Sequence, residues 1–131
     1  MSSAHDQDLP RVMDHFLNPR HVGDVAGADG VGEVGAVACS DVLRLSLRVR
    51  DGRIAEARFR AYGCGAAIAC GSVTTELVLG RTLDEALQVT NQDVHRALGG
   101  ELPPSKAHCP VLAEEAIRAA VRDCRARSGQ G

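Results

Sequence analysis

Aromatic side chains and surplus positive charge are both scarce in this sequence, which limits what the protein can bind. Phe, Tyr and Trp together make up 2% of the 131 residues, and the formal net charge at pH 7 is −2. Surfaces for single-stranded nucleic acid stack bases on aromatic rings, and surfaces for duplexes or anionic membranes are basic. The composition therefore predicts neither a nucleic-acid partner nor a membrane partner.

Long apolar runs are missing as well. No segment approaches the roughly 20 apolar residues that span a bilayer. The opening MSSAHDQDLP has no basic region followed by an apolar stretch, so it does not resemble a signal peptide. We therefore expect a cytoplasmic protein whose five cysteines stay reduced. Their odd number also argues against a closed disulfide framework and favours metal or redox chemistry.

The remaining composition is that of a globular domain, with 44% hydrophobic and 24% charged residues. We expect one domain over residues 10–127, with flexible tails at 1–9 and 128–131. Apolar and polar residues alternate along 42–50 and 53–62, and Asp51-Gly52 between them is a strong hairpin turn. The pattern predicts an antiparallel hairpin, with one more strand within 20–38.

Helical signals surround the hairpin. The sequence predicts helices over residues 10–17 and 66–79, two short helices opening at Thr82 and Asn91, and a last helix that begins at Pro110. Strands followed by several helices are typical of an α+β domain. We expect a small antiparallel sheet of about three strands packed against these helices, with the C-terminal helix last.

Three cysteines stand where loops meet these elements. Cys39 precedes the first hairpin strand, Cys64 lies between the second strand and a helix, and Cys109 directly precedes the last helix. Helix N-termini favour negative charge, so we expect the thiol pKa at Cys64 and Cys109 to be lowered. Asp41 and His108 add a carboxylate and an imidazole, and the set suggests a metal or cluster site.

The residues alone leave alternatives open. The cysteines are 25 and 45 residues apart with no C-x-x-C pair, so inert buried thiols or a thiol-based enzyme also fit. Cys70 and Cys124 lie on apolar helix faces and are expected to pack in the core. His15 and His21 flank a turn and are expected to make local hydrogen bonds.

Other polar residues also have simpler interpretations. Asp41 could pair with Arg44, and His108 could support a ligand without being one. The arginines of the hairpin are expected to form a solvated face of the sheet: Arg44, Arg48, Arg50, Arg58 and Arg60.

Four motifs together resemble the U-type iron–sulfur cluster assembly scaffolds, the IscU and NifU-like family. The motifs occur in the same order and at the same spacing as in that family, and the resemblance extends from Val12 to about Asp123. The four motifs are Asp14 to Gly23 (DHFLNPRHVG), Ala38 to Asp41 (ACSD), Tyr62 to Ala69 (YGCGAAIA) and Leu102 to Cys109 (LPPSKAHC).

The resemblance implies a scaffold and carrier, not an enzyme with turnover. Such a scaffold accepts sulfur from a cysteine desulfurase, assembles a transient [2Fe–2S] cluster with iron, and transfers it to apo-proteins. By matching positions, the thiol ligands would be Cys39, Cys64 and Cys109, and Cys109 would be the persulfide acceptor. Asp41 would be a labilising ligand, His108 an alternative ligand, and Lys106 a nearby cation that offsets the negative charge of the thiolates and the cluster. Zinc is expected to be able to occupy the same thiolate-rich site.

Departures and rivals follow from the same comparison. Ser40 replaces the family's glycine, and Cys70 stands where a small polar residue is usual. Ser105 interrupts the Leu-Pro-Pro-Val-Lys segment by which the family is recognised by an Hsp70-type chaperone, so dependence on such a chaperone is not predicted from this segment. A homodimer is a further possible assembly.

One rival is a zinc-dependent sulfur-transfer partner of a desulfurase, as in SufU proteins. The spacing from Cys64 to Cys109 leaves no room for the SufU insertion and favours the IscU/NifU branch. The other rival is a structural or regulatory zinc module, which would unfold without its metal.

Overall fold

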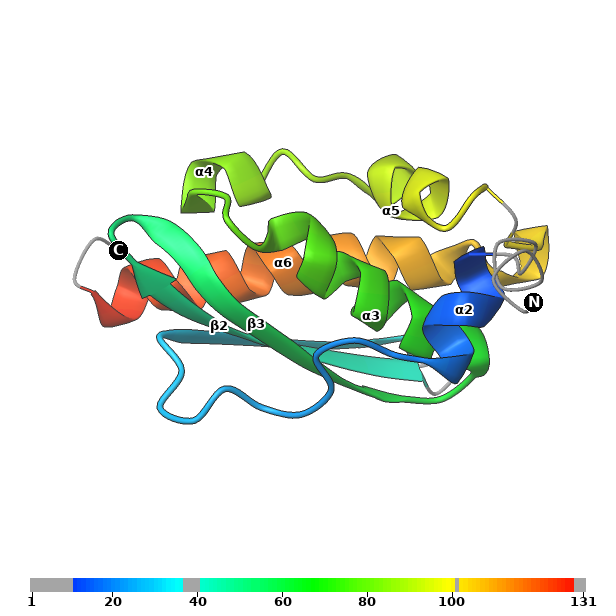
Figure 1. Ribbon diagram of the computed structural model, residues 1–131, viewed down its shortest axis with the longest axis horizontal. Helices are drawn as coiled ribbons and strands as arrows, with labels where there is room; N and C mark the ends of the chain where they lie inside the picture. Colours follow the sequence, from blue (N-terminus) through cyan, green and yellow to red (C-terminus); the bar gives the residue numbers. More distant parts are fainter. Residues whose placement is uncertain (1–10, 37–40, 101, 129–131) are drawn as a thin grey trace, which may run out of the picture.

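A three-stranded antiparallel sheet backed by helices forms the protein, which we describe from a computed structural model over residues 11–36, 41–100 and 102–128 (Figure 1). The strands are β1 (Gly30–Ala36), β2 (Asp41–Arg50) and β3 (Arg53–Tyr62), in the order β1-β2-β3. The helices are α2 (Arg11–Leu17), α3 (Gly65–Val78), α4 (Leu83–Ala86), α5 (Asn91–Ala97), the short 3-10 helix η1 (Pro104–Lys106) and α6 (His108–Arg127).

The predicted α+β class, its three strands and its final C-terminal helix are confirmed. No helix in the described ranges has both the length and the apolar character needed to cross a membrane. The tails expected at 1–9 and 128–131 lie outside the described residues, except for Ser128.

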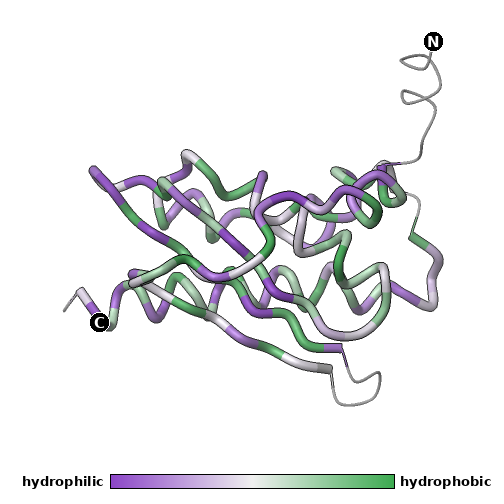
Figure 2. The backbone as a smooth tube through the Cα atoms, turned by 60° about the horizontal axis from the view of Figure 1, so that its bottom comes forward, coloured by the Kyte–Doolittle hydropathy of each residue, from purple (hydrophilic) through white to green (hydrophobic). Residues whose placement is uncertain are grey.

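The hairpin forms as predicted, but a bulge between Arg48 and Val49 shifts its register by one residue, so Ile54 is buried where the simple alternation predicts Ala55. Leu43, Leu45 and Leu47 of β2 are buried and lie opposite Ala61, Phe59 and Ala57 of β3. Asp51 and Gly52 both have positive φ, 53° and 76°, as the two central residues of a type I′ hairpin turn require. Figure 2 shows the resulting alternation of hydrophilic and hydrophobic residues along the strands. One face of the hairpin is therefore committed to the core.

The polar face of the sheet is partly covered by the segment 21–29. The segment first bonds the free edge of β3, where Phe59 N donates to His21 O at 2.9 Å and Gly23 N donates to Phe59 O at 2.8 Å. It then carries Asp24 across to Arg44 and Arg60, at N–O distances of 3.1 and 2.7 Å. The hairpin arginines contact solvent, as expected, but four of them are held in ion pairs: Arg44, Arg48, Arg58 and Arg60.

Two long helices, α3 and α6, cover the apolar face of the sheet (Figure 1). Helix α6 approaches β1 so closely that a Cβ on Gly32 would lie 2.5 Å from Ala116 O, and one on Gly30 would lie 2.3 Å from Cys124 Sγ. Cys70 and Cys124 are 0% and 4% exposed within this core, which confirms their predicted packing role.

Helix α2 is attached to α3 by histidines. The Nδ1 atom of His15 lies 2.7 Å from Ser72 Oγ, and that of His21 lies 2.9 Å from Thr75 Oγ1. Hydrogen bonding by both rings was predicted, but the prediction that it is local was wrong, because both partners are on α3. His15 is 7% exposed, so its ring needs a partner within the fold.

Two helix starts differ from the prediction. The N-cap of α5 is Thr90, whose hydroxyl accepts from Asp93 N, and Asn91 is the first helical residue. The backbone N and Nδ2 of Asn91 instead donate to Glu114 Oε1 on α6, at 2.6 and 2.9 Å. Helix α6 begins at His108, so Cys109 lies inside its first turn. The capping box at Thr82 is confirmed.

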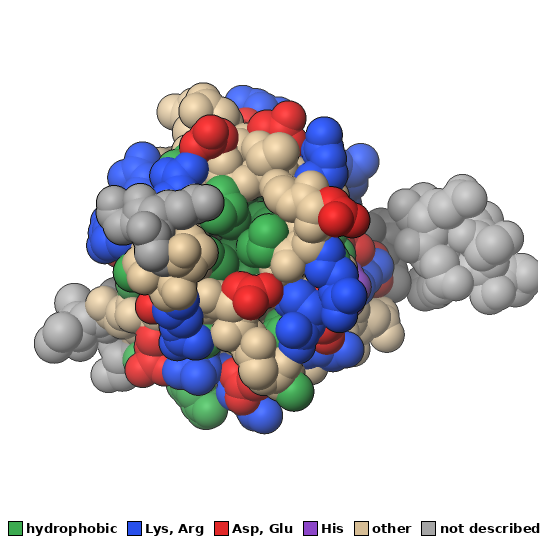
Figure 3. All heavy atoms as spheres, turned by 90° about the vertical axis from the view of Figure 1, so that its left-hand side faces the viewer, with side chains coloured by type: hydrophobic (Ala, Val, Ile, Leu, Met, Phe, Trp, Pro, Cys, Tyr) green, Lys and Arg blue, Asp and Glu red, His purple; other side chains and the backbone are tan. Residues whose placement is uncertain are grey.

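A hollow of about 590 Å³ lies at the end of the molecule where α6 ends, beside α4 and the hairpin turn. Figure 3 shows apolar side chains on its floor and charged side chains around its rim. Two rim arginines are paired, Arg125 with Asp84 and Arg127 with Asp123. The first pair joins α6 to α4, whereas the second lies within α6.

We expect Gly32→Ala to destabilise the fold, because the added methyl group would overlap the backbone of α6. The loss in the free energy of unfolding should be about 1–3 kcal/mol, the usual cost of overpacking. Urea denaturation would measure it. Gly35→Ala is the matched control on the same strand, since its Cβ would meet its nearest neighbours at 3.4 Å. Equal losses in the two variants would contradict this account of the β1–α6 contact.

Acidification should loosen the attachment of α2. Burial lowers the pKa of His15 below its usual 6.5, and Arg20 lowers it further, while Glu76 and Asp14 oppose the shift. The unfolded chain therefore binds the proton more readily, and stability falls as the pH drops below 6.5 towards the lower folded pKa. In urea titrations at several pH values, His15→Gln should lose less stability over this range than the wild type. Parallel pH curves would show that His15 does not contribute.

Candidate metal centre

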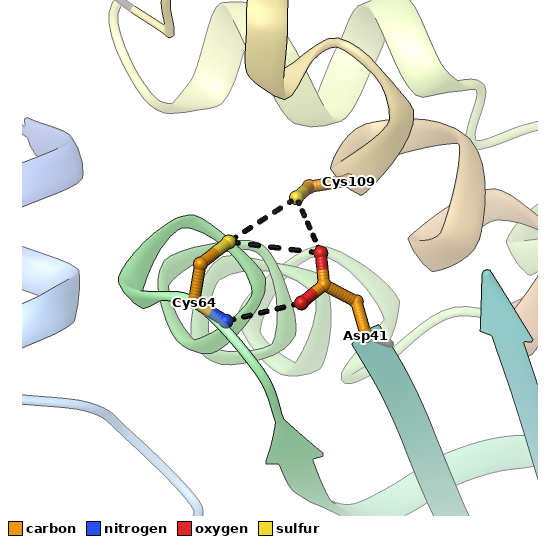
Figure 4. A group of neighbouring side chains, drawn as sticks. All are labelled: Asp41, Cys64 and Cys109. Carbon is orange, nitrogen blue, oxygen red and sulfur yellow. Dashed lines mark hydrogen bonds between the residues drawn. The ribbon is translucent and has the colours of Figure 1, made fainter. Parts of the chain in front are cut away.

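Three metal-ligating side chains converge where β2 begins and α3 and α6 start (Figure 4). They are Asp41, Cys64 and Cys109, and one ligand atom of each lies within 4.8 Å of the other two. The two sulfurs are 3.9 Å apart, and Asp41 Oδ2 is 3.7 Å from Cys64 Sγ and 3.8 Å from Cys109 Sγ. Segments far apart in the sequence thus place two thiols and a carboxylate together.

The chain around Cys64 is shaped to admit Asp41. Gly63 has a φ of 133°, and a Cβ there would lie 1.9 Å from Asp41 Oδ1. With no side chain in the way, Asp41 Oδ1 accepts a hydrogen bond from Cys64 N at 3.1 Å. Cys64 is the N-cap of α3, so this backbone contact fixes the carboxylate beside the start of the helix.

His108 completes the group from the first residue of α6. Its Nε2 atom lies 2.6 Å from Asp41 Oδ2 and 3.5 Å from Cys109 Sγ. The alternative pairing of Asp41 with Arg44 is therefore wrong, since Arg44 pairs with Asp24 and Glu33 instead. An imidazole nitrogen is thus available next to the two sulfurs and the carboxylate oxygen.

The surroundings of the centre lower the pKa of Asp41 and raise the pKa of Cys109. Burial raises the pKa of Asp41, but hydrogen bonds from His108 and Cys64 outweigh it, so the pKa is lower than usual and the group is a carboxylate. Burial raises the pKa of Cys109, and the neighbouring thiols of Cys70 and Cys64 raise it further. The lowered pKa predicted for Cys109 was therefore wrong, because desolvation exceeds the benefit of the helix N-terminus.

The predicted site residues divide into three groups. The structure brings together Asp41, Cys64, Cys109 and His108. Cys39 lies outside the described residues, together with Ser40. Lys106 lies in η1 and makes no ion pair within the described part of the chain.

Two features of the site were not predicted. Phe16 of α2 packs over the start of α3. Its ring is so close to Gly65 that a Cβ added there would lie 2.9 Å from Phe16 Cε1. Gly63 makes room for the Asp41 side chain, because a Cβ there would overlap Asp41 Oδ1. Neither contact has a signal in a single sequence, because both join segments distant along the chain.

The donor set indicates the kind of metal that fits. Thiolate sulfur and imidazole nitrogen are typical ligands of zinc and of iron–sulfur clusters, whereas magnesium and calcium prefer oxygen alone. Hydrogen bonds among the donors hold them in place, as outer contacts commonly do around metal ligands. The fold and the centre together define an α+β domain able to hold a thiolate-bound metal or cluster.

Comparison with known proteins assigns this domain to a family. The family described as NifU-like N terminal domain matches residues 7–130, so the chain belongs to it. The iron–sulfur cluster assembly scaffold protein IscU of Escherichia coli K12 is 50% identical over 121 residues, which cover 89% of this chain and 93% of that protein. The bifunctional protein NifU/MnmA of Rubrobacter xylanophilus is 49% identical over 121 residues, covering 92% of this chain but 25% of the relative.

A solved structure agrees in fold. The N-terminal part of a nitrogen-fixing NifU-like protein from Brucella abortus superposes with a TM-score of 0.72, covering 94% of this chain and 97% of that one. Its sequence identity is 18%, so the likeness concerns the fold alone.

We expect Gly63→Ala to weaken metal binding at this centre, because its Cβ would displace the Asp41 carboxylate. Zinc affinity, measured by competition with a chromophoric chelator, should fall about tenfold or more. Gly23→Ala is the matched control: Gly23 has a similar φ of 121°, but a Cβ there would meet nothing within 4 Å. Equal zinc affinities in the two variants would show that Asp41 does not support the metal.

Proposed function

We propose that the protein is a scaffold for iron–sulfur cluster assembly that receives sulfur and iron, holds a [2Fe–2S] cluster transiently and passes it to apo-proteins. The observation that carries the proposal is the convergence of Cys64, Cys109 and Asp41 in a chain that belongs to the NifU-like N-terminal family. The relatives named as IscU scaffolds add support, because the similarity extends over almost the whole of both chains.

The ligand set of the proposal follows from the donors. Cys64 and Cys109 supply thiolates, and Cys39 supplies a third from two residues before Asp41, a separation that limits the distance between their Cα atoms to roughly 7 Å. The carboxylate of Asp41 is a harder and weaker ligand for iron than a fourth thiolate, which suits a cluster that must leave. His108 is within reach as an alternative donor, and Lys106 adds a positive charge two residues before it.

A protein partner is needed at this site to deliver sulfur. Cys109, the proposed persulfide acceptor, is 1% exposed. Three large apolar side chains near the centre are nevertheless exposed: Phe16 at 41%, Tyr62 at 59% and Val111 at 41%. They favour docking of a protein, and we assign that role to a cysteine desulfurase in the cytoplasm.

One observation favours a second candidate function. The ligand atoms of Asp41, Cys64 and Cys109 lie within 4.8 Å of one another, which also suits a single tetrahedral zinc ion. In that case the protein would hold zinc and accept persulfide from the desulfurase without building a cluster.

Anaerobic reconstitution with ferrous iron, cysteine and a cysteine desulfurase tests the proposal. We expect native mass spectrometry to show the addition of two irons and two sulfides to the wild type, and their loss in Cys39→Ser, Cys64→Ser and Cys109→Ser. Asp41→Cys should assemble the cluster but transfer it to an apo-ferredoxin about tenfold more slowly, because a fourth thiolate then replaces the weaker oxygen ligand.

Cys124→Ala is the matched control, since Cys124 is a buried thiol at the far end of α6. It should assemble and transfer the cluster as the wild type does. A wild-type protein that gains only sulfur while keeping one zinc ion would reject the scaffold in favour of the zinc-holding sulfur carrier.

A further inference from the structure

The thiols of Cys64 and Cys109 are in contact but differ in exposure. Their sulfurs are 3.9 Å apart, Cys109 is 1% exposed, and Cys64 is half-buried. They belong to separate elements, the N-cap of α3 and the first turn of α6. Because a disulfide bond is about 2.05 Å long, a short movement of the two side chains is enough for the sulfurs to bond.

We propose that Cys64 is the resolving thiol for a persulfide on Cys109, and that its attack releases sulfide within the metal centre. The inference rests on the proposed function, which supplies the persulfide. It adds to that function a source for the electrons that convert the delivered sulfur into sulfide.

The step balances without any other reductant. The Cys64 sulfur attacks Cys109 Sγ and forms the Cys64–Cys109 disulfide. The bond between Cys109 Sγ and the outer sulfur breaks, and the outer sulfur leaves with the electron pair. With the proton from Cys64 and its own proton it becomes hydrogen sulfide. The Cys64 sulfur is oxidised to the disulfide level, the outer sulfur is reduced to sulfide, and Cys109 Sγ remains at the disulfide level.

Position favours Cys64 over competing thiols. A persulfide on buried Cys109 is shielded from thiols in solution, whereas Cys64 is already in contact with it. A reactant held at this distance has a large advantage over one that must diffuse in. Asp41 Oδ2 lies 3.7 Å from Cys64 Sγ and accepts from it, which orients the thiol within the centre.

Cys70 is the other thiol of the described chain near this centre, and it fits the role less well. It is 0% exposed, and burial raises its pKa to about 12. Its sulfur is not part of the described group whose ligand atoms lie within 4.8 Å of one another. Cys70 therefore serves as the matched control for Cys64, since both are on or beside α3.

Sulfide release uses the electrons of Cys64, so cluster assembly then depends on a second reductant that restores the two thiols. Once the disulfide has formed, neither sulfur can bind iron, and a dithiol must reduce it before the centre accepts a cluster. Sulfide release and cluster binding are then separate steps that use the same two residues.

A single-turnover reaction tests the proposal. The full chain is incubated anaerobically with a catalytic amount of a cysteine desulfurase and one equivalent of cysteine, without iron or dithiol. Released sulfide is measured by methylene blue formation, and the protein is alkylated and analysed by intact and peptide mass spectrometry. The wild type should release close to one sulfide per chain and become lighter by two hydrogens, with a peptide cross-link from Cys64 to Cys109.

The variants separate the roles of the cysteines. Cys64→Ser should retain one extra sulfur atom on Cys109 and release sulfide about a hundredfold more slowly. Cys70→Ala should match the wild type. If Cys64→Ser fails to fold, the cross-link map of the wild type still decides the matter.

Each remaining outcome overturns the inference. A wild type that keeps the extra sulfur on Cys109 without releasing sulfide removes Cys64 from the role and leaves the scaffold intact. A cross-link from Cys109 to Cys39 or Cys70 assigns the resolving thiol elsewhere. If neither the wild type nor Cys64→Ser gains sulfur or releases sulfide, Cys109 is not a sulfur acceptor, and the proposed function loses that step as well.

Discussion

The buried carboxylate of Asp41 is the constraint on which the functional end of this protein depends. One oxygen accepts from the backbone of Cys64 at the start of α3, and the other meets the ring of His108 at the start of α6. Asp41 itself is the first residue of β2. A single side chain therefore joins the strand to both long helices, and the register of the sheet determines where the two thiols meet.

Burial of this carboxylate is costly unless its oxygens are hydrogen-bonded. The backbone of Cys64 and the ring of His108 supply these bonds, and Gly63 next to Cys64 has no side chain to block them. Asp41 is 2% exposed, and Gly63 leaves the space that its Oδ1 occupies. The protein's own hydrogen bonds thus hold the carboxylate beside both thiols.

Patterns that act over short distances made most of the fold predictable. The alternation around Asp51-Gly52 predicts the hairpin but not the bulge that shifts its register, and Thr82 with Glu85 predicts a helix start. Contacts between distant segments were not predictable in this way. The partner of His15 depends on α3 packing nearby, and the raised pKa of Cys109 depends on burial that the helix-terminus argument omits. The N-cap of α5 differs from these, because Thr90 and Asp93 form a local capping box whose signal is present in the sequence and was missed. The members of the centre were named from motifs, but their mutual contacts required the fold.

Burial also explains why the two thiols should not be equivalent in function. Cys109 lies inside the first turn of α6 with its thiol removed from water, which protects whatever it carries and slows any exchange with solution. Cys64 lies at the edge of the same centre and remains partly open. A protein that must hold a reactive sulfur and then part with it needs both properties. Here they occur side by side, because Cys64 stands at the N-cap of α3 whereas Cys109 lies inside the first turn of α6.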